Sequence, residues 1–173
     1  ARGQYVEADR VTETDGRFFF EGRPVNREYG KMGKSLKNMV TPDEMYDAFG
    51  ADTFRLYEMS GGPLEASRPW STRDVVGMQR FLQRLWRNFV DEDTGGLVVV
   101  DEPADDETRR LLARTVAGVD ADLDALQANT AVAKLIELNN HVTKLDAIPR
   151  EVAEALVLMA SPLVPHVGEE LWS

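Results

Sequence analysis

The sequence predicts a mainly α-helical protein, in which a short β-hairpin and a charged loop lead into an α-helical bundle. Three observations support this fold class. From residue 71 onward, segments with one apolar stripe at helical spacing fill most of the chain. The clearest strand pattern lies within the first 20 residues. Between these regions, residues 25–39 show no regular period and carry much charge, which indicates a loop.

The first expected element is a β-hairpin. Residues 5–11 and 18–20 are expected to form its strands, and Thr-Asp-Gly-Arg at 14–17 its turn. Residues 21–24, Glu-Gly-Arg-Pro, predict a second tight turn before the loop.

Two short helices are expected next. Thr41 is a suitable N-cap, and Pro42 fits the first helical position. Gly50 predicts the end of this helix, and Asp52 is a candidate cap for the following one. That second helix is expected to stop at Gly-Gly-Pro, residues 61–63.

The remaining chain predicts a helical bundle. Ser71 is expected to open a long helix that runs to about Val90. Residues 91–104 indicate a loop, with a short extended piece at 97–100. Four further helices are predicted, with boundaries at 105–126, 130–145, 149–160 and from 161 to the end. Because no stop signal precedes residue 173, we expect the bundle to be truncated there.

Composition narrows the possible functions. The chain has 173 residues, no Cys and two His, which excludes disulfides, thiolate metal sites and thiol catalysis, and no protein-bound metal is expected. No apolar run is long enough for a transmembrane helix, so no membrane role is expected and the predicted setting is the cytoplasm. The net charge of −10 argues against a general nucleic-acid-binding protein.

A basic segment stands out against this acidic background. Between residues 23 and 37, five basic residues are accompanied by one acidic residue, Glu28. Such a local concentration favours a small anionic target held at one place. A solvated loop that keeps the protein soluble is the alternative.

The basic segment contains the candidate site, Lys31-Met32-Gly33-Lys34-Ser35. Two lysines three positions apart can direct two ammonium groups at one polyphosphate, and Gly33 allows close backbone approach. The hydroxyl of Ser35 and the following amides add hydrogen-bond donors. The pattern is not a Walker loop, because no Gly-x-x-x-x-Gly-Lys-Ser/Thr is present.

A second set of candidates lies on the long helix. Arg80, Arg84 and Arg87 share one face at spacings of four and three residues and can meet RNA phosphates, unless they form an ordinary solvated face. His141 and His166 are expected to be structural.

Several runs resemble a known family, the class I aminoacyl-tRNA synthetases. Residues 31–38, Lys-Met-Gly-Lys-Ser-Leu-Lys-Asn, resemble the family's Lys-Met-Ser-Lys-Ser (KMSKS) signature. Residues 49–56, Phe-Gly-Ala-Asp-Thr-Phe-Arg-Leu, resemble the motif that follows it in the leucine, isoleucine, valine and methionine enzymes. Residues 161–172 resemble a helix start in the tRNA-binding bundle of that subgroup, and residues 55–70 and 77–87 look like the bacterial leucine enzymes.

The resemblance implies an enzyme that activates leucine with ATP to leucyl-adenylate and transfers it to tRNA(Leu). It gives Lys34 the main catalytic contact with phosphate and Lys31 an assisting one, with Ser35 and Asn38 as weaker candidates. Met32, Gly33 and Ser35 would belong to the ATP-binding loop. Mg²⁺ would arrive with ATP, and the enzyme would be a monomer. Two departures are visible: Gly33 replaces the usual Ser, and Leu-Lys at 36–37 replaces the more frequent Lys-Gly.

The resemblance also implies a division of the chain into three parts. Residues 1–40 would hold the hairpin and the KMSKS-type loop at the end of the catalytic domain, 41–70 the connecting helices, and 71–173 the truncated tRNA-binding bundle. The family's His-x-Gly-His signature is missing from these 173 residues, so this piece alone is expected to be inactive. A non-catalytic helical RNA- or protein-binding module and another class I synthetase (isoleucyl, valyl or methionyl) are the alternatives.

Overall fold

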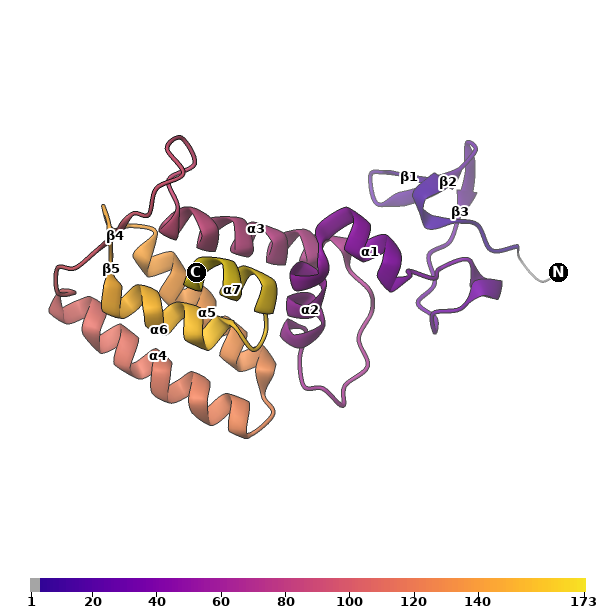
Figure 1. Cartoon of the computed structure of the whole chain (residues 1–173). Coiled ribbons are helices and arrows are strands. Elements are labelled where there is room, and N and C mark those ends of the chain that lie inside the picture. The colour runs from indigo at the N-terminus through magenta and orange to yellow at the C-terminus, as the bar shows by residue number, and fades with distance from the viewer. Residues whose placement is uncertain (1–3) are drawn as a thin grey trace. The chain divides into compact units, whose positions relative to one another are not determined.

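A computed structural model describes residues 4–173 and confirms a mainly α-helical protein. The chain forms two compact units, residues 1–45 (the N-terminal unit) and residues 46–173 (the C-terminal unit). Within the described residues there are seven α-helices, a three-stranded sheet and a two-stranded sheet (Figure 1). None of these helices is both long enough and apolar enough to cross a membrane. The predicted three-part division stays a prediction, and its residues 1–3 lie outside the described residues.

The N-terminal unit contains an antiparallel sheet of three strands, β1 (Val11–Thr14), β2 (Arg17–Phe20) and β3 (Arg23–Val25). Two-residue turns at Asp15-Gly16 and Glu21-Gly22 join them, and all four turn residues have positive φ angles between 49° and 75°. Such turns match the twist of paired strands. The sheet therefore forms around two local turn signals.

Two predictions about this sheet were wrong in detail. The first strand begins at Val11 instead of ending there, because the turn at Asp15-Gly16 sets the register and pairs Thr14 with Arg17. The second turn uses only Glu21 and Gly22, so residues 23–25 are free to pair as a third strand.

Helix α1 (Pro42–Phe49) begins as predicted at Thr41. The Thr41 amide donates to Glu44 Oε2 at 2.9 Å, and the Glu44 amide donates to Thr41 Oγ1 at 3.3 Å. This reciprocal pair is a capping box. The hydrogen bond from the Thr41 amide holds the pKa of Glu44 below its usual range. Helix α1 stops before Gly50, whose φ of 82° suits glycine.

Helix α2 (Ala51–Ser60) ends at the predicted Gly-Gly-Pro, but Asp52 does not cap it. Gly50 is the N-cap residue, and Asp52 lies in the first turn with its side chain buried. Its carboxylate bonds to helix α7 (Pro165–Trp172) instead. The sequence prediction was wrong because an acidic residue at a helix start can serve a distant helix as well as its own.

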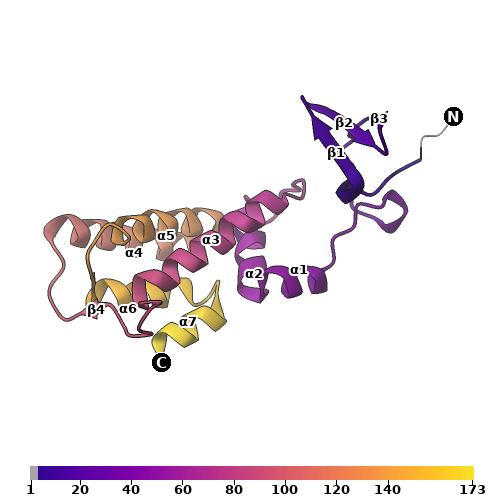
Figure 2. The same ribbon diagram turned by 90° about the horizontal axis from the view of Figure 1, so that it is seen from above.

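The C-terminal unit is a helical bundle formed by α2, α3 (Thr72–Phe89), α4 (Asp106–Asp124), α5 (Ala128–Val142), α6 (Arg150–Ala160) and α7. Helix α5 is the centre, because it contacts α2, α3, α4 and α6 and buries Ala131, Leu135 and Leu138 almost completely. Figure 2 shows α4 and α5 side by side. Ser71 caps α3 as its position predicted. Asp105, which was expected to be the first residue of its helix, is the N-cap of α4.

Helix α4 buries a narrower face than its apolar pattern suggested. Val116 continues the apolar spacing, yet its exposed fraction is 42%. The helix ends at Asp124 and not at the predicted residue 126, so Leu126, which is 72% exposed, lies outside it. Thr108 and Thr115 are buried instead. Helix α4 packs mainly against α5 and α6, so part of its apolar pattern faces solvent.

The segment between α3 and α4 contains the predicted short extended piece. Strand β4 (Val99–Val100) pairs in parallel with β5 (Ile148–Pro149) just before α6. The last helix, α7, begins at Pro165 and not at residue 161. The amides of Leu163 and Val164 still donate to Ala160 O and so close α6, and Pro165 lacks an N–H and fits the first position of the new helix.

Candidate functional site

The candidate phosphate loop, residues 31–38, lies in the N-terminal unit between β3 and α1. Gly33 is extended and precedes a single 3-10 turn, Lys34–Leu36. The turn is closed by hydrogen bonds from the Leu36 amide to Gly33 O at 3.0 Å and from the Lys37 amide to Lys34 O at 3.2 Å. Lys34 therefore opens a tight turn directly after an extended residue.

The structure gathers all five predicted residues in this loop. The side chains of Lys31, Met32, Lys34 and Ser35 are exposed, and Gly33 is partly covered. Within residues 4–173, neither lysine has a carboxylate within 4 Å. Two solvated ammonium groups without an internal counter-charge are suited to an anionic ligand such as a polyphosphate.

Asn38 holds the two ends of the loop together. Its Oδ1 accepts a hydrogen bond from the Gly33 amide at 2.9 Å, and its Nδ2 donates to Lys31 O at 3.4 Å. We call these two hydrogen bonds the Asn38 bridge. No periodic pattern in the sequence reveals this contact, because it joins residues five and seven positions apart in an irregular segment.

The structure gives a physical account of the two departures from the family signature. A Cβ at Gly33 would meet no atom within 4 Å, and the φ of −176° there is ordinary extended backbone, so the usual Ser fits. Lys37 has a φ of 52° and a ψ of 35°, the left-handed conformation that glycine adopts most easily. The glycine that is more frequent at this position suits the same backbone.

The three arginines lie exposed on one helix, as predicted, but they differ in their hydrogen bonds. Arg80, Arg84 and Arg87 are all exposed on α3. Arg84 donates to Asn140 Oδ1 on α5, and Arg87 Nε donates to Gln83 O at 3.2 Å. Arg80 makes no side-chain hydrogen bond or ion pair among the described residues. It is therefore the member most available to a partner.

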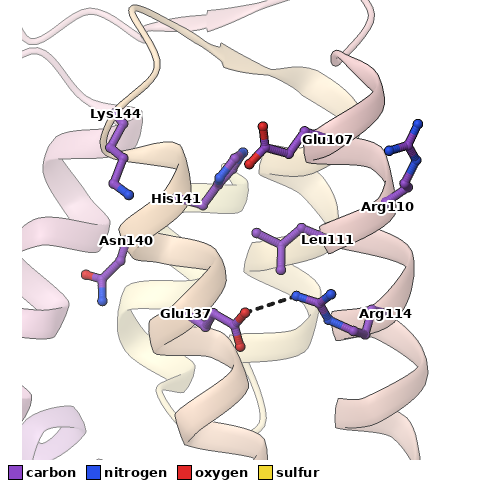
Figure 3. A pocket seen from close by; sticks show the side chains of 8 residues that line it. All are labelled: Glu107, Arg110, Leu111, Arg114, Glu137, Asn140, His141 and Lys144. Carbon is purple, nitrogen blue, oxygen red and sulfur yellow. Dashed lines mark hydrogen bonds and ion pairs between the residues drawn. The ribbon is translucent and has the colours of Figure 1, made fainter.

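A groove of about 490 Å³ lies between α4 and α5 (Figure 3). Arg114 and Glu137 form an ion pair of 3.0 Å across it. Lys144 has no carboxylate within 4 Å in the described part of the chain. The lining is mixed in charge and comes from α4, α5 and the turn after α5: Glu107, Arg110, Leu111, Arg114, Glu137, Asn140, His141 and Lys144. Sequence reasoning missed the groove because its residues are up to 37 positions apart.

Both histidines hold helices in place, as expected. Thr108 Oγ1 donates to Asp105 Oδ2 at 2.9 Å and lies 2.7 Å from His141 Nε2, so the histidine nitrogen is the donor to this hydroxyl. His166 Nδ1 lies 2.8 Å from Asp52 Oδ1. In the described residues, no three His, Cys, Asp or Glu side chains are grouped to hold a metal ion.

The chain is similar along its whole length to part of several larger proteins. It is 64% identical over 172 residues to the leucine–tRNA ligase of Salinispora arenicola, a match that covers 99% of this chain and 18% of that protein. It is 63% identical over 177 residues to the leucine–tRNA ligase of Frankia casuarinae, covering 100% of this chain and 17% of that protein. The chain thus spans less than a fifth of the length of these relatives. No family model matches it.

A solved structure supports the same similarity. The AgnB2 LeuRS of Agrobacterium radiobacter K84, solved in a ternary complex with tRNA and LeuAMS, superposes with a TM-score of 0.65 at 26% identity. The match covers 82% of this chain and 20% of that one.

Proposed function

We propose that this chain is the segment of a bacterial leucine–tRNA ligase that carries its ATP-phosphate loop and part of its tRNA-binding bundle. The complete enzyme would activate leucine with ATP to leucyl-adenylate and then transfer leucine to tRNA(Leu). The observation that carries the proposal is the exposed loop of Lys31 and Lys34, without internal counter-charges, in a chain 64% identical to such a ligase. The similarity to proteins of this name favours leucine over isoleucine, valine or methionine.

In the first half-reaction, a carboxylate oxygen of leucine forms a bond to the α-phosphorus of ATP. The bond from this phosphorus to the bridging oxygen breaks, and pyrophosphate leaves with the bonding electrons. Negative charge therefore grows on the departing pyrophosphate. An ammonium group at that place stabilises the transition state more than the ground state, which accelerates the step.

Lys34 has the main role in this proposal and Lys31 the assisting one. Met32, Gly33 and Ser35 belong to the same ATP-binding loop, where backbone amides and the Ser35 hydroxyl offer further donors. Mg²⁺ comes as part of the ATP substrate. Since the proposed step needs no nucleophilic side chain, the absence of cysteine from the sequence is compatible with it.

The helical bundle would bind the second substrate, tRNA. We infer that Arg80, Arg84 and Arg87 contact the tRNA backbone, supported by their exposure on α3 and by the tRNA bound to the similar LeuRS. The enzyme would act as a monomer in the cytoplasm. The 173-residue chain alone is expected to make no leucyl-adenylate, because it lacks a His-x-Gly-His nucleotide-binding signature.

The test compares the two half-reactions in the complete ligase by single-turnover kinetics. Lys34→Ala should lower the rate of adenylate formation roughly a hundredfold, because a charge contact made mainly in the transition state contributes about 3 kcal/mol. Transfer of leucine from preformed adenylate to tRNA should change little, since pyrophosphate has already left. Lys34→Arg should recover only part of the loss, because a planar guanidinium cannot take the position of a compact ammonium.

Lys37→Gly is the matched control. It also removes one positive charge from the loop, and its backbone φ of 52° accepts glycine without strain. Adenylate formation should stay within about twofold of the wild type. Equal losses in Lys34→Ala and Lys37→Gly would mean that only the total charge of the loop matters, and equal losses in both half-reactions would remove Lys34 from the proposed role.

A further inference from the structure

We propose that Asn38 is a positioning residue, which sets the directions of Lys31 and Lys34 through the loop backbone without touching ATP itself. This inference rests on the proposed function. The inference goes further than the proposed function because it gives the Asn38 side chain a role, and that role does not involve contact with phosphate.

The geometry of the Asn38 bridge carries the argument. The two backbone groups that it joins, Lys31 C=O and Gly33 N–H, flank Met32. In an extended backbone, the C=O of one residue and the N–H of the residue two positions later point to the same side. In a β-sheet, a neighbouring strand would form hydrogen bonds with both groups. The Asn38 amide has one acceptor oxygen and a donor nitrogen, so one side chain replaces that strand.

Each bonded group belongs to, or lies next to, one of the two lysines. Lys31 contributes its own carbonyl, and Gly33 directly precedes Lys34, the first residue of the 3-10 turn. The bridge therefore fixes where both side chains leave the backbone. The following residues add a second constraint, because the Lys37 amide donates to Lys34 O and the left-handed Lys37 leads the chain to Asn38.

Little else holds this segment in one conformation. Of residues 31–38, only Gly33 and Leu36 are partly covered, and the others are exposed. The two ammonium groups also repel each other, which favours their separation in the absence of an anion. A loop with few packing contacts samples many conformations, and each productive alignment lost lowers the rate. The Asn38 bridge and the two backbone hydrogen bonds of the 3-10 turn are then the local restraints among the described contacts.

The decisive experiment measures adenylate formation in the complete ligase. Asn38→Ala should lower the single-turnover rate roughly tenfold while the Kd of ATP changes less than about threefold, because the charges remain but their alignment is lost. Asn38→Gln distinguishes alignment from contact. Its longer amide could still reach a phosphate, but it does not fit the short span of the bridge, so little recovery is expected. Full recovery with Gln would overturn the proposal.

Coupling to Lys34 supplies a second readout that a merely structural role would not produce. In a Lys34→Ala background, Asn38→Ala should lower the rate by less than about threefold, because the main group that it positions is already gone. An unchanged tenfold loss in that background would contradict the proposal. So would a large loss in the transfer of leucine from preformed adenylate to tRNA, which would indicate general damage to the fold.

Asn26→Ala is the matched control, because Asn26 is an exposed asparagine in the same irregular segment and makes no side-chain hydrogen bond among the described residues. Its rate should equal that of the wild type. The two proposals also fail separately. No effect of Lys34→Ala would overturn the proposed function, whereas a hundredfold loss with Lys34→Ala and none with Asn38→Ala would overturn only the positioning role.

Discussion

Asp52 and His166 are separated by 113 residues in the sequence but are joined by a hydrogen bond of 2.8 Å between Oδ1 and Nδ1. The other carboxylate oxygen of Asp52 accepts from the Val167 amide at 2.7 Å, so Asp52 caps the start of α7. One turn further along α2, Arg55 donates to Pro162 O and Leu163 O at 3.2 and 3.3 Å. Asp52 and Arg55, in the segment that resembled a family motif, thus bind α2 to the first turn of α7 and to the chain just before it.

Removing the Asp52 carboxylate should destabilise the C-terminal unit. Asp52→Ala removes two hydrogen bonds at a side chain that is only 7% exposed and leaves the Val167 amide without its acceptor, at an expected cost of about 2 kcal/mol. Urea denaturation of the chain measures this. Asp47→Ala, at an exposed position on the neighbouring helix, should stay within about 0.5 kcal/mol. Equal urea midpoints for Asp52→Ala and Asp47→Ala would contradict this stabilising role of Asp52.

The same substitution should destabilise the protein at Gly50 but not at Gly33. A Cβ would meet no atom within 4 Å at either Gly33 or Gly50, so space does not distinguish them. Gly33 is extended, whereas Gly50 has a φ of 82° and a ψ of 157°, a region that other residues rarely adopt. Gly33→Ser should change the unfolding free energy by less than about 0.5 kcal/mol. Gly50→Ser should cost about 1–3 kcal/mol, and a smaller loss there than at Gly33 would refute the distinction.

Acid should weaken the start of α4 through Asp105. Hydrogen bonds from Thr108 and Glu107 hold the pKa of Asp105 below its ordinary value of 3.8. A lowered pKa in the folded state means that this stabilisation is complete above the unfolded value and is lost as the pH falls through the folded one. Asp105→Asn can still cap the helix but does not titrate. As the pH falls from about 5 to about 3, the wild type should therefore lose more unfolding free energy than Asp105→Asn. If the difference in unfolding free energy between the two proteins stayed constant over this range, Asp105 would make no such contribution.

Arg80 should contribute more to tRNA binding than its neighbours on α3, because Arg84 and Arg87 already donate to groups within the chain. In the complete ligase, Arg80→Ala should weaken tRNA binding and reduce the slope of log K against log salt by roughly 1, as expected for one lost phosphate contact. Arg150→Ala serves as the control, because Arg150 lies on α6 and pairs with Asp101. An unchanged slope for Arg80→Ala would remove this residue from the interface.

The local features of the fold were predictable from neighbouring residues. Thr41 and Ser71 cap their helices because each capping oxygen needs only an amide three residues away. The turn at Asp15-Gly16 was predictable for the same reason, since both residues tolerate positive φ. The limits of the first strand were not, because its flanking residues alternate only weakly.

The sequence by itself determined the helical class, the caps at Thr41 and Ser71, the turn at Asp15-Gly16 and the loop of Lys31 and Lys34, since these depend on interactions between residues close together in the chain. Only the tertiary structure decided that Asp52 serves α7 instead of its own helix, and that α4 leaves Val116 in solvent. The same holds for the groove between α4 and α5. The physical reason is that a side chain with several possible hydrogen-bond or apolar partners takes the one that packing brings near, and packing joins residues whose separation in the sequence carries no signal.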